Sequence, residues 1–214
     1  MTVSRRAFGG LVSGAIVAGS GCLGFILGDE AQEFEASPAT ASDASLDETG
    51  YEQANEEETT KQEVSRTFSA ADQEREVVAV NYMSEYERSV SFLGMEQRAA
   101  VFVAFSTPQV DLFGRTFNPL DDMSNRELIR QVQGRYEGME VGDEVETAEV
   151  DTLGGTVELS KFEGQADLDG TSVDVYIHIG QVEHDGDFVV PIGVYPQEVD
   201  EEENLVALVE EVEH

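Results

Sequence analysis

The sequence predicts an α+β domain, a mainly antiparallel β-sheet with a mid-chain helix and a C-terminal helix packed on it. Runs of alternating apolar and polar residues, typical of half-buried strands, fill much of the chain after residue 60. Two other stretches repeat apolar residues at helical spacing, each behind a pair able to form a capping box. Neither an internal repeat nor a long proline- or serine-rich linker interrupts residues 33–214, so one domain is expected there.

The strand signals are strongest in the last third of the chain. Apolar residues alternate with polar ones from Val173 to Ile179 and again from Phe188 to Val194. Asp185-Gly186 lies between these runs and predicts a tight turn, because glycine accepts a positive φ angle. A continuous apolar run at 99–106 predicts a central strand buried on both faces. Further strands are expected near 64–68, at 78–82, and as a hairpin of 145–151 with 157–159.

Helix signals occur at three places. Ser42 is suited to cap a short helix over 42–48 that Gly50 ends. Ser124 and Glu127 form a capping box ahead of the mid-chain stripe, and Asp200 and Glu203 are expected to do the same for the last helix. The two apolar stripes are Leu128, Ile129, Val132 and Tyr136, and Leu205, Leu208, Val209 and Val212.

The N-terminal residues predict export. Arg5 and Arg6, followed by Phe8, precede an uncharged glycine-rich run that contains Cys22, the only cysteine. This order resembles a twin-arginine translocation signal over residues 1–21, with lipid attachment at Cys22 and a tether over 22–32. Gly19 stands where the lipobox pattern prefers leucine. An uncleaved N-terminal anchor therefore remains the alternative to a lipoprotein on the outer face of the cell membrane.

The composition predicts a salt-loving source. The chain carries 45 acidic and 12 basic residues, for a net charge of −33, and removal of residues 1–21 takes away two arginines and no acid, which leaves −35. Such charge destabilises a compact state through self-repulsion, which high salt screens. Nucleic acid is excluded as a partner because clusters of lysine and arginine are missing. A single cysteine excludes an intrachain disulfide or a cysteine-rich metal site.

The search for catalytic motifs gives no catalytic residue, metal site or cofactor. The sequence has no G-x-S-x-G elbow, no H-E-x-x-H and no P-loop. His178 is expected half-exposed on the polar face of a strand. His184 is expected at the solvent beside its turn, where the short turn would splay Glu183, Asp185 and Asp187 apart.

A possible binding surface combines one loop with one strand face. Arg115, Phe117 and Asn118 lie between the central strand and the mid-chain helix, and Tyr176 and His178 share the polar face of their strand. The phenylalanines of the loop have a simpler interpretation, which is favoured: they plug the gap between sheet and helix.

Several short stretches resemble a family of haloarchaeal lipoproteins known as domain-of-unknown-function family 6517. They are Phe34-Glu35-Ala36-Ser37-Pro38-Ala39, Glu48-Thr49-Gly50-Tyr51-Glu52, Ser106-Thr107-Pro108-Gln109-Val110, Phe117-Asn118-Pro119 and Val182-Glu183-His184. The resemblance covers nearly the whole chain and implies a halophilic archaeal source and attachment outside the cytoplasmic membrane. It transfers no catalytic residue. The order of elements is also similar to the PsbP-type αβα sandwich, which implies no activity.

Two functions follow as hypotheses. The first is a non-catalytic, membrane-anchored binding or accessory module with an unknown protein or small-molecule partner. The alternative is a cell-surface hydrolase that uses carboxylates or His178. Convergence of His178, Asp174 and another polar group in a pocket would favour the hydrolase, and a flat polar face would favour the binding module.

Overall fold

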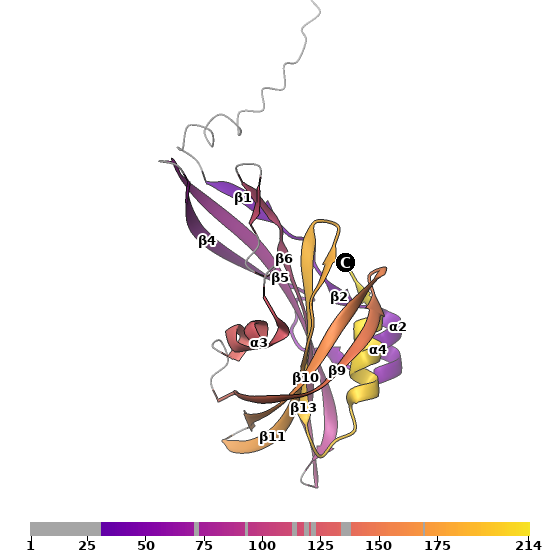
Figure 1. Cartoon of the computed structure of the whole chain (residues 1–214). Coiled ribbons are helices and arrows are strands. Elements are labelled where there is room, and N and C mark those ends of the chain that lie inside the picture. The colour runs from indigo at the N-terminus through magenta and orange to yellow at the C-terminus, as the bar shows by residue number, and fades with distance from the viewer. Residues whose placement is uncertain are drawn as a thin grey trace, which may run out of the picture.

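The structure is a computed structural model that describes residues 31–70, 73–92, 94–112, 115–117, 120, 123–133, 138–168 and 170–214. It confirms the predicted α+β class: one large, mostly antiparallel sheet carries the helices (Figure 1). The predicted signal over 1–21 and Cys22 lie outside the described residues.

Two meanders form the main part of the ten-stranded sheet. The first contains β4 (Thr60–Ala70), β5 (Gln73–Phe92) and β6 (Met95–Pro108). The second contains β9 (Glu140–Thr152), β10 (Gly155–Leu168), β11 (Thr171–Ile179) and β13 (Asp187–Pro196). They join where β6 pairs antiparallel with β13, so the main strand order is β1-β5-β6-β13-β11-β10-β9. The predicted central strand at 99–106 is thus confirmed as the middle of β6.

Short strands complete the sheet and two small ladders. β1 (Gln32–Glu35) pairs with β5 in parallel, which makes the sheet mixed rather than purely antiparallel. β3 (Glu52–Gln53) pairs with β5, and β12 (Val182–His184) pairs with β13. Separate two-stranded ladders join β2 (Thr40–Ala41) to β14 (Val212–Glu213) and β7 (Val110–Leu112) to β8 (Arg115–Phe117).

The predicted tight turn at Asp185-Gly186 is present, and a second tight turn closes the predicted hairpin of 145–151 with 157–159. Asp185 and Gly186 have φ angles of 48° and 90° and connect β12 to β13. Leu153 and Gly154, at 50° and 73°, connect β9 to β10. Positive φ at both central residues matches the twist of the flanking strands, which is why Asp-Gly predicts such turns well. The strand across the Asp185-Gly186 turn is β12, however, while β11 pairs further along β13.

The first helix begins and ends as the sequence predicts, and the mid-chain helix begins as predicted, whereas Tyr136 of its predicted stripe lies outside the described residues. α2 (Asp43–Thr49) is capped by the Ser42 side chain, which accepts from the Ser45 amide, and ends at Gly50 with φ 72°. α3 (Asn125–Gln133) has the predicted capping box: the Ser124 amide donates to Glu127 Oε2 at 2.9 Å, and the Glu127 amide to Ser124 Oγ at 3.4 Å. The Ser124 amide lowers the pKa of Glu127, since it favours the carboxylate form.

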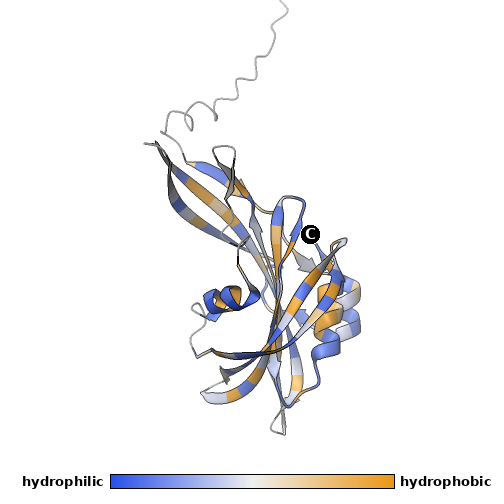
Figure 2. Ribbon diagram, in the orientation of Figure 1, coloured by the Kyte–Doolittle hydropathy of each residue, from blue (hydrophilic) through white to orange (hydrophobic). Residues whose placement is uncertain are grey.

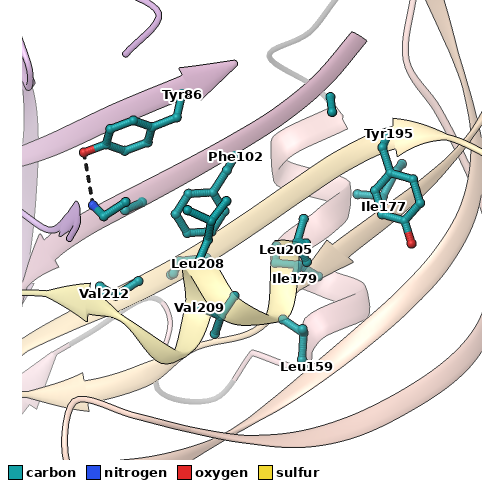
Figure 3. Close-up of a cluster of buried hydrophobic side chains, with 14 of the residues drawn as sticks. Tyr86, Phe102, Leu159, Ile177, Ile179, Tyr195, Leu205, Leu208, Val209 and Val212 are labelled. Atoms are coloured by element: carbon teal, nitrogen blue, oxygen red, sulfur yellow. Dashed lines mark hydrogen bonds between the residues drawn. The ribbon is translucent and has the colours of Figure 1, made fainter. Parts of the chain in front are cut away.

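The predicted capping box of the last helix is wrong. α4 (Glu202–Glu210) begins after Glu201, and no side chain caps it. Glu201 is buried and instead forms an ion pair with Arg88 of β5. The predicted apolar residues Leu205, Leu208, Val209 and Val212 are nevertheless all buried, although Val212 lies in β14, beyond the end of α4. In Figure 3 these side chains point from the C-terminal segment toward the strands beneath.

The two faces of the sheet are covered differently. On one face, the segment 36–42 lies against β5 and β6, while α4 lies over β13 and β9 and contacts α2, and we call it the covered face. Ser84 and Ser106 donate hydrogen bonds to backbone carbonyls of this segment, at 2.7 and 2.6 Å, and the Ala41 amide donates to Tyr86 Oη at 3.0 Å. α3 lies on the opposite side of the sheet from α2 and α4, and we call that side the open face (Figure 1).

Candidate binding groove

A groove of about 180 Å³ lies on the open face, between α3 and the strands, and we call it the α3 groove. Several of its apolar side chains stay half-buried instead of being fully covered: Val64, Ala79, Met83, Phe105, Leu120, Val132 and Ile192. An apolar cavity of about 150 Å³ is large enough for benzene, so this groove suits a small apolar molecule.

The groove exists because α3 covers only part of the open face. Asn125 of α3 donates from Nδ2 to the Glu158 carbonyl at 2.9 Å and to Ser160 Oγ at 3.0 Å. The Arg126 guanidinium lies 5.2 Å from the ring centroid of Phe162. These contacts fix α3 over the second meander. Apolar positions of β4, β5 and β6 continue beyond the helix (Figure 2), and they form the floor of the groove.

Asn81 is the unusual residue of this floor. It is 6% exposed, and its Oδ1 atom is buried without a hydrogen-bond partner among the described residues. An unsatisfied buried acceptor costs about 1–3 kcal/mol, and such groups are rare in folded proteins. Sequence reasoning missed Asn81, although a signal exists: it occupies an apolar position in the alternation Val77, Ala79, Asn81, Met83.

The loop of the predicted binding surface borders the groove. Arg115 and Phe117 lie in β8, which pairs with β7, and Val110 of β7 lines the groove. Leu120, just after the loop, lines it as well. Asn118 lies outside the described residues. β8, with Arg115 and Phe117, is therefore beside the candidate site.

Tyr176 and His178 do not belong to the same surface. Their neighbour Ile179 lines the groove, whereas their own side chains point to the covered face. Lys161 Nζ lies 4.4 Å from the Tyr176 ring centroid and 2.6 Å from Glu202 Oε2. Tyr176 thus belongs to a junction between the second meander and the start of α4, and the predicted surface is divided by the sheet.

The expectation that His178 is half-exposed is wrong. The residue is 2% exposed, its ring stacks on Tyr195 with centroids 5.5 Å apart, and its Nε2 lies 3.1 Å from Tyr195 Oη. Burial lowers the pKa of His178 to about 4, because the charged imidazolium loses its hydration, while nearby Glu202 opposes this effect. His178 is therefore a neutral core residue at neutral pH.

His178 and Asp174 do not converge in a pocket. They lie four residues apart on β11, which corresponds to about 13 Å along a strand. Asp174 Oδ1 instead accepts a hydrogen bond from Gln165 Nε2 at 2.8 Å. The geometry that would favour a hydrolase built on His178 is not found at these residues.

The other two histidines meet across the fold. His214 Nε2 lies 3.2 Å from Asp187 Oδ2, and His214 Nδ1 lies 2.9 Å from His184 Nδ1. The Ser37 amide also donates to Asp187 Oδ2, at 2.7 Å. His184 is therefore half-buried rather than solvent-exposed, because the C-terminal segment packs against it. Within the described ranges, no group of three histidine, cysteine or acidic side chains is arranged to hold a metal ion.

Comparison with known proteins identifies a family. The family model for a domain of unknown function (DUF6517) matches residues 38–213, which include β2 to β14 and helices α2, α3 and α4. Comparison with curated proteins gives no match. Among the described residues, none of the helices has the length and apolar character needed to span a bilayer. Because the match covers most of the chain, this protein belongs to the DUF6517 family.

Proposed function

We propose that the protein is a membrane-anchored, extracytoplasmic binding module that holds a small apolar ligand in the α3 groove. The observation that carries the proposal is a half-open apolar groove with a buried, unpartnered acceptor, Asn81 Oδ1. A bound ligand would cover the half-buried side chains, and each Å² of apolar surface removed from water contributes about 25 cal/mol. A donor on the ligand would satisfy Asn81.

The location outside the membrane rests on the N-terminal sequence. Arg5, Arg6 and Phe8 support twin-arginine export, and Cys22 supports a lipid anchor. β1 begins at Gln32, so residues 22–31 would connect the anchor to the sheet over at most about 36 Å. The acidic composition supports a halophilic archaeal source. In this proposal the module needs no cofactor, does not bind nucleic acid and is not catalytic.

Calorimetric titration with 1-octanol, in multimolar potassium chloride, tests the groove. Wild-type protein should bind the alcohol. Ala79→Phe should abolish binding because the added ring fills the floor of the groove. Ala148→Phe is the matched control, since Ala148 is exposed on β9, away from the groove, and this variant should bind as wild type does. Absence of octanol binding to the wild type, or equal binding by Ala79→Phe, would contradict the proposal.

Two variants test the anchor. Replacing Arg5 and Arg6 by lysine should trap the precursor in the cytoplasm, and unchanged export would refute the twin-arginine route. Cys22→Ser should release the protein or leave an uncleaved precursor in the membrane. A mature wild-type protein that keeps residues 1–21 and an unmodified Cys22, as measured by mass spectrometry, would refute lipid attachment.

A further inference from the structure

We infer that the ligand of the α3 groove is an anionic single-chain amphiphile, with its headgroup at Arg66 and a hydroxyl group on its chain near Asn81. The inference rests on the proposed function and assigns the chemistry of the ligand. The headgroup is a carboxylate or a phosphate, because a guanidinium binds both through paired N–H donors.

Because the protein is strongly acidic, the position of each cationic side chain indicates where an anion could bind. With 45 acidic and 12 basic residues, the protein repels anions over most of its surface. An anion is therefore bound only where a positive side chain is free to meet it. Four of the described cations are already engaged with glutamates: Lys61 with Glu35 at 3.4 Å, Arg98 with Glu87 at 3.1 Å, Lys161 with Glu202 at 2.6 Å, and Arg88 with Glu201.

Arg66 differs from these residues. Arg66 lines the α3 groove from β4 and is exposed. It makes neither an ion pair nor a hydrogen bond with the described residues. A free guanidinium beside an otherwise apolar groove has the donors that an anionic headgroup needs. The groove thus combines a charged end with an apolar floor.

The strand register sets the spacing of the two polar groups. Arg66 is paired with Val77 across β4 and β5, and Asn81 follows Val77 by four residues. The two positions are therefore about 13 Å apart along the strand. The pair between them on this face is Val64 and Ala79, which is apolar. An extended chain along β5 would place its anion at Arg66, its methylene groups over Ala79, and its hydroxyl hydrogen toward Asn81 Oδ1.

The volume of the groove favours a short single chain. At about 180 Å³ it is close in size to cavities that hold one small hydrocarbon. Suitable probes are therefore octyl compounds that differ only at their ends: ω-hydroxyoctanoate, octanoate, octyl phosphate, 1-octanol and octyltrimethylammonium.

Titration of these probes into wild-type protein, Arg66→Gln and Asn81→Leu provides the test. We expect ω-hydroxyoctanoate to bind most tightly to the wild type and octyltrimethylammonium most weakly. Arg66→Gln should weaken octanoate or octyl phosphate about tenfold or more, and leave 1-octanol unchanged. Asn81→Leu should weaken ω-hydroxyoctanoate and 1-octanol, but not octanoate. The relative loss of octanoate and octyl phosphate in Arg66→Gln identifies which headgroup the arginine prefers.

The outcomes separate this inference from the proposed function. Equal affinity of wild type and Arg66→Gln for both anions, with 1-octanol still bound and still lost in Ala79→Phe, would overturn the anionic ligand and leave an apolar binding module. Failure of every probe to bind the folded wild type would overturn both. Arg66 is exposed, so Arg66→Gln should fold normally, and circular dichroism checks this.

Discussion

Gly193 of β13 lies directly beneath Leu205 of α4: a Cβ atom at position 193 would stand 1.6 Å from Leu205 Cδ1. Leu205 is fully buried and belongs to the cluster that joins α4 to the sheet (Figure 3). The missing side chain at 193 therefore provides the space in which the helix docks.

Gly193→Ala should lower the free energy of unfolding by about 3 kcal/mol, because the added methyl group forces Leu205 or the helix to move. Denaturant titration in high salt measures the change. Gly155→Ala is the control, since its Cβ would make an ordinary 3.6 Å contact with Val182 Cγ2. In a Gly193→Ala background, Leu205→Ala should lower the free energy of unfolding by less than it does in the wild type. Equal stability of the two glycine variants would contradict this account of α4 docking.

Asn81→Leu should raise the free energy of unfolding of the unliganded protein by about 1 kcal/mol or more, because it removes an unsatisfied buried acceptor and adds apolar contact. Thermal unfolding of the unliganded protein measures this change. Asn125→Leu should have the opposite effect, because Asn125 Nδ2 makes two hydrogen bonds that hold α3 on the second meander. A loss of stability in Asn81→Leu would show that Asn81 serves the fold rather than a ligand.

Local signals predicted the fold well. Ser42, Gly50, Ser124 and Glu127 act on backbone groups within a few residues, so their effect can be read from the sequence alone. The apolar alternation likewise predicted the buried side of β11. It did not do so for β13, which is buried on both sides except at Ile192 and Val194 of the predicted apolar side. Asp200 and Glu203 matched the same capping pattern and failed, because Glu201 is held by Arg88 from another strand.

The candidate site could not be predicted in the same way, because it depends on contacts between segments that are distant in the sequence. Arg115 and Tyr176 were assigned to one surface, but nothing in a loop sequence says which face of the sheet its hairpin will border. The burial of His178 depends on Tyr195, and that of His184 on His214. The groove itself results from α3 covering only one meander, which is a property of helix placement rather than of any single segment.

His178 should make the protein less stable in mild acid. Its pKa of about 4 in the folded state lies below the ordinary value of 6.5, so folding favours the neutral imidazole. The contribution of the neutral His178 imidazole to the free energy of unfolding is complete above pH 6.5. It is lost as the pH falls from 6.5 to about 4, by roughly 3 kcal/mol in total. Comparing unfolding free energies of wild type and His178→Gln across this range isolates the effect from carboxylate titration. A difference between the two that does not vary with pH would contradict the neutral buried imidazole.

High salt should be required for folding. The acidic side chains far outnumber the cations, and at about 1 M salt the Debye length is near 3 Å, which screens most of their repulsion. A stable domain keeps a margin of only about 5–15 kcal/mol, which this repulsion can exceed. Circular dichroism from multimolar potassium chloride to dilute buffer should show a cooperative loss of structure. The same spectrum and melting temperature at both extremes would show that the acidity serves solubility alone.

The ladder between β2 and β14 determines the order in which parts of the fold can form during synthesis. It pairs Thr40 and Ala41 with Val212 and Glu213, and the Ser42 amide donates to the Glu211 carbonyl at 3.1 Å. The meander hairpins can close while the ribosome is still translating, because their partners are neighbours in the chain. The covered face cannot close until residues 211–213 have emerged. The proposed twin-arginine route, which exports folded proteins, would let this late step finish in the cytoplasm before the protein crosses the membrane.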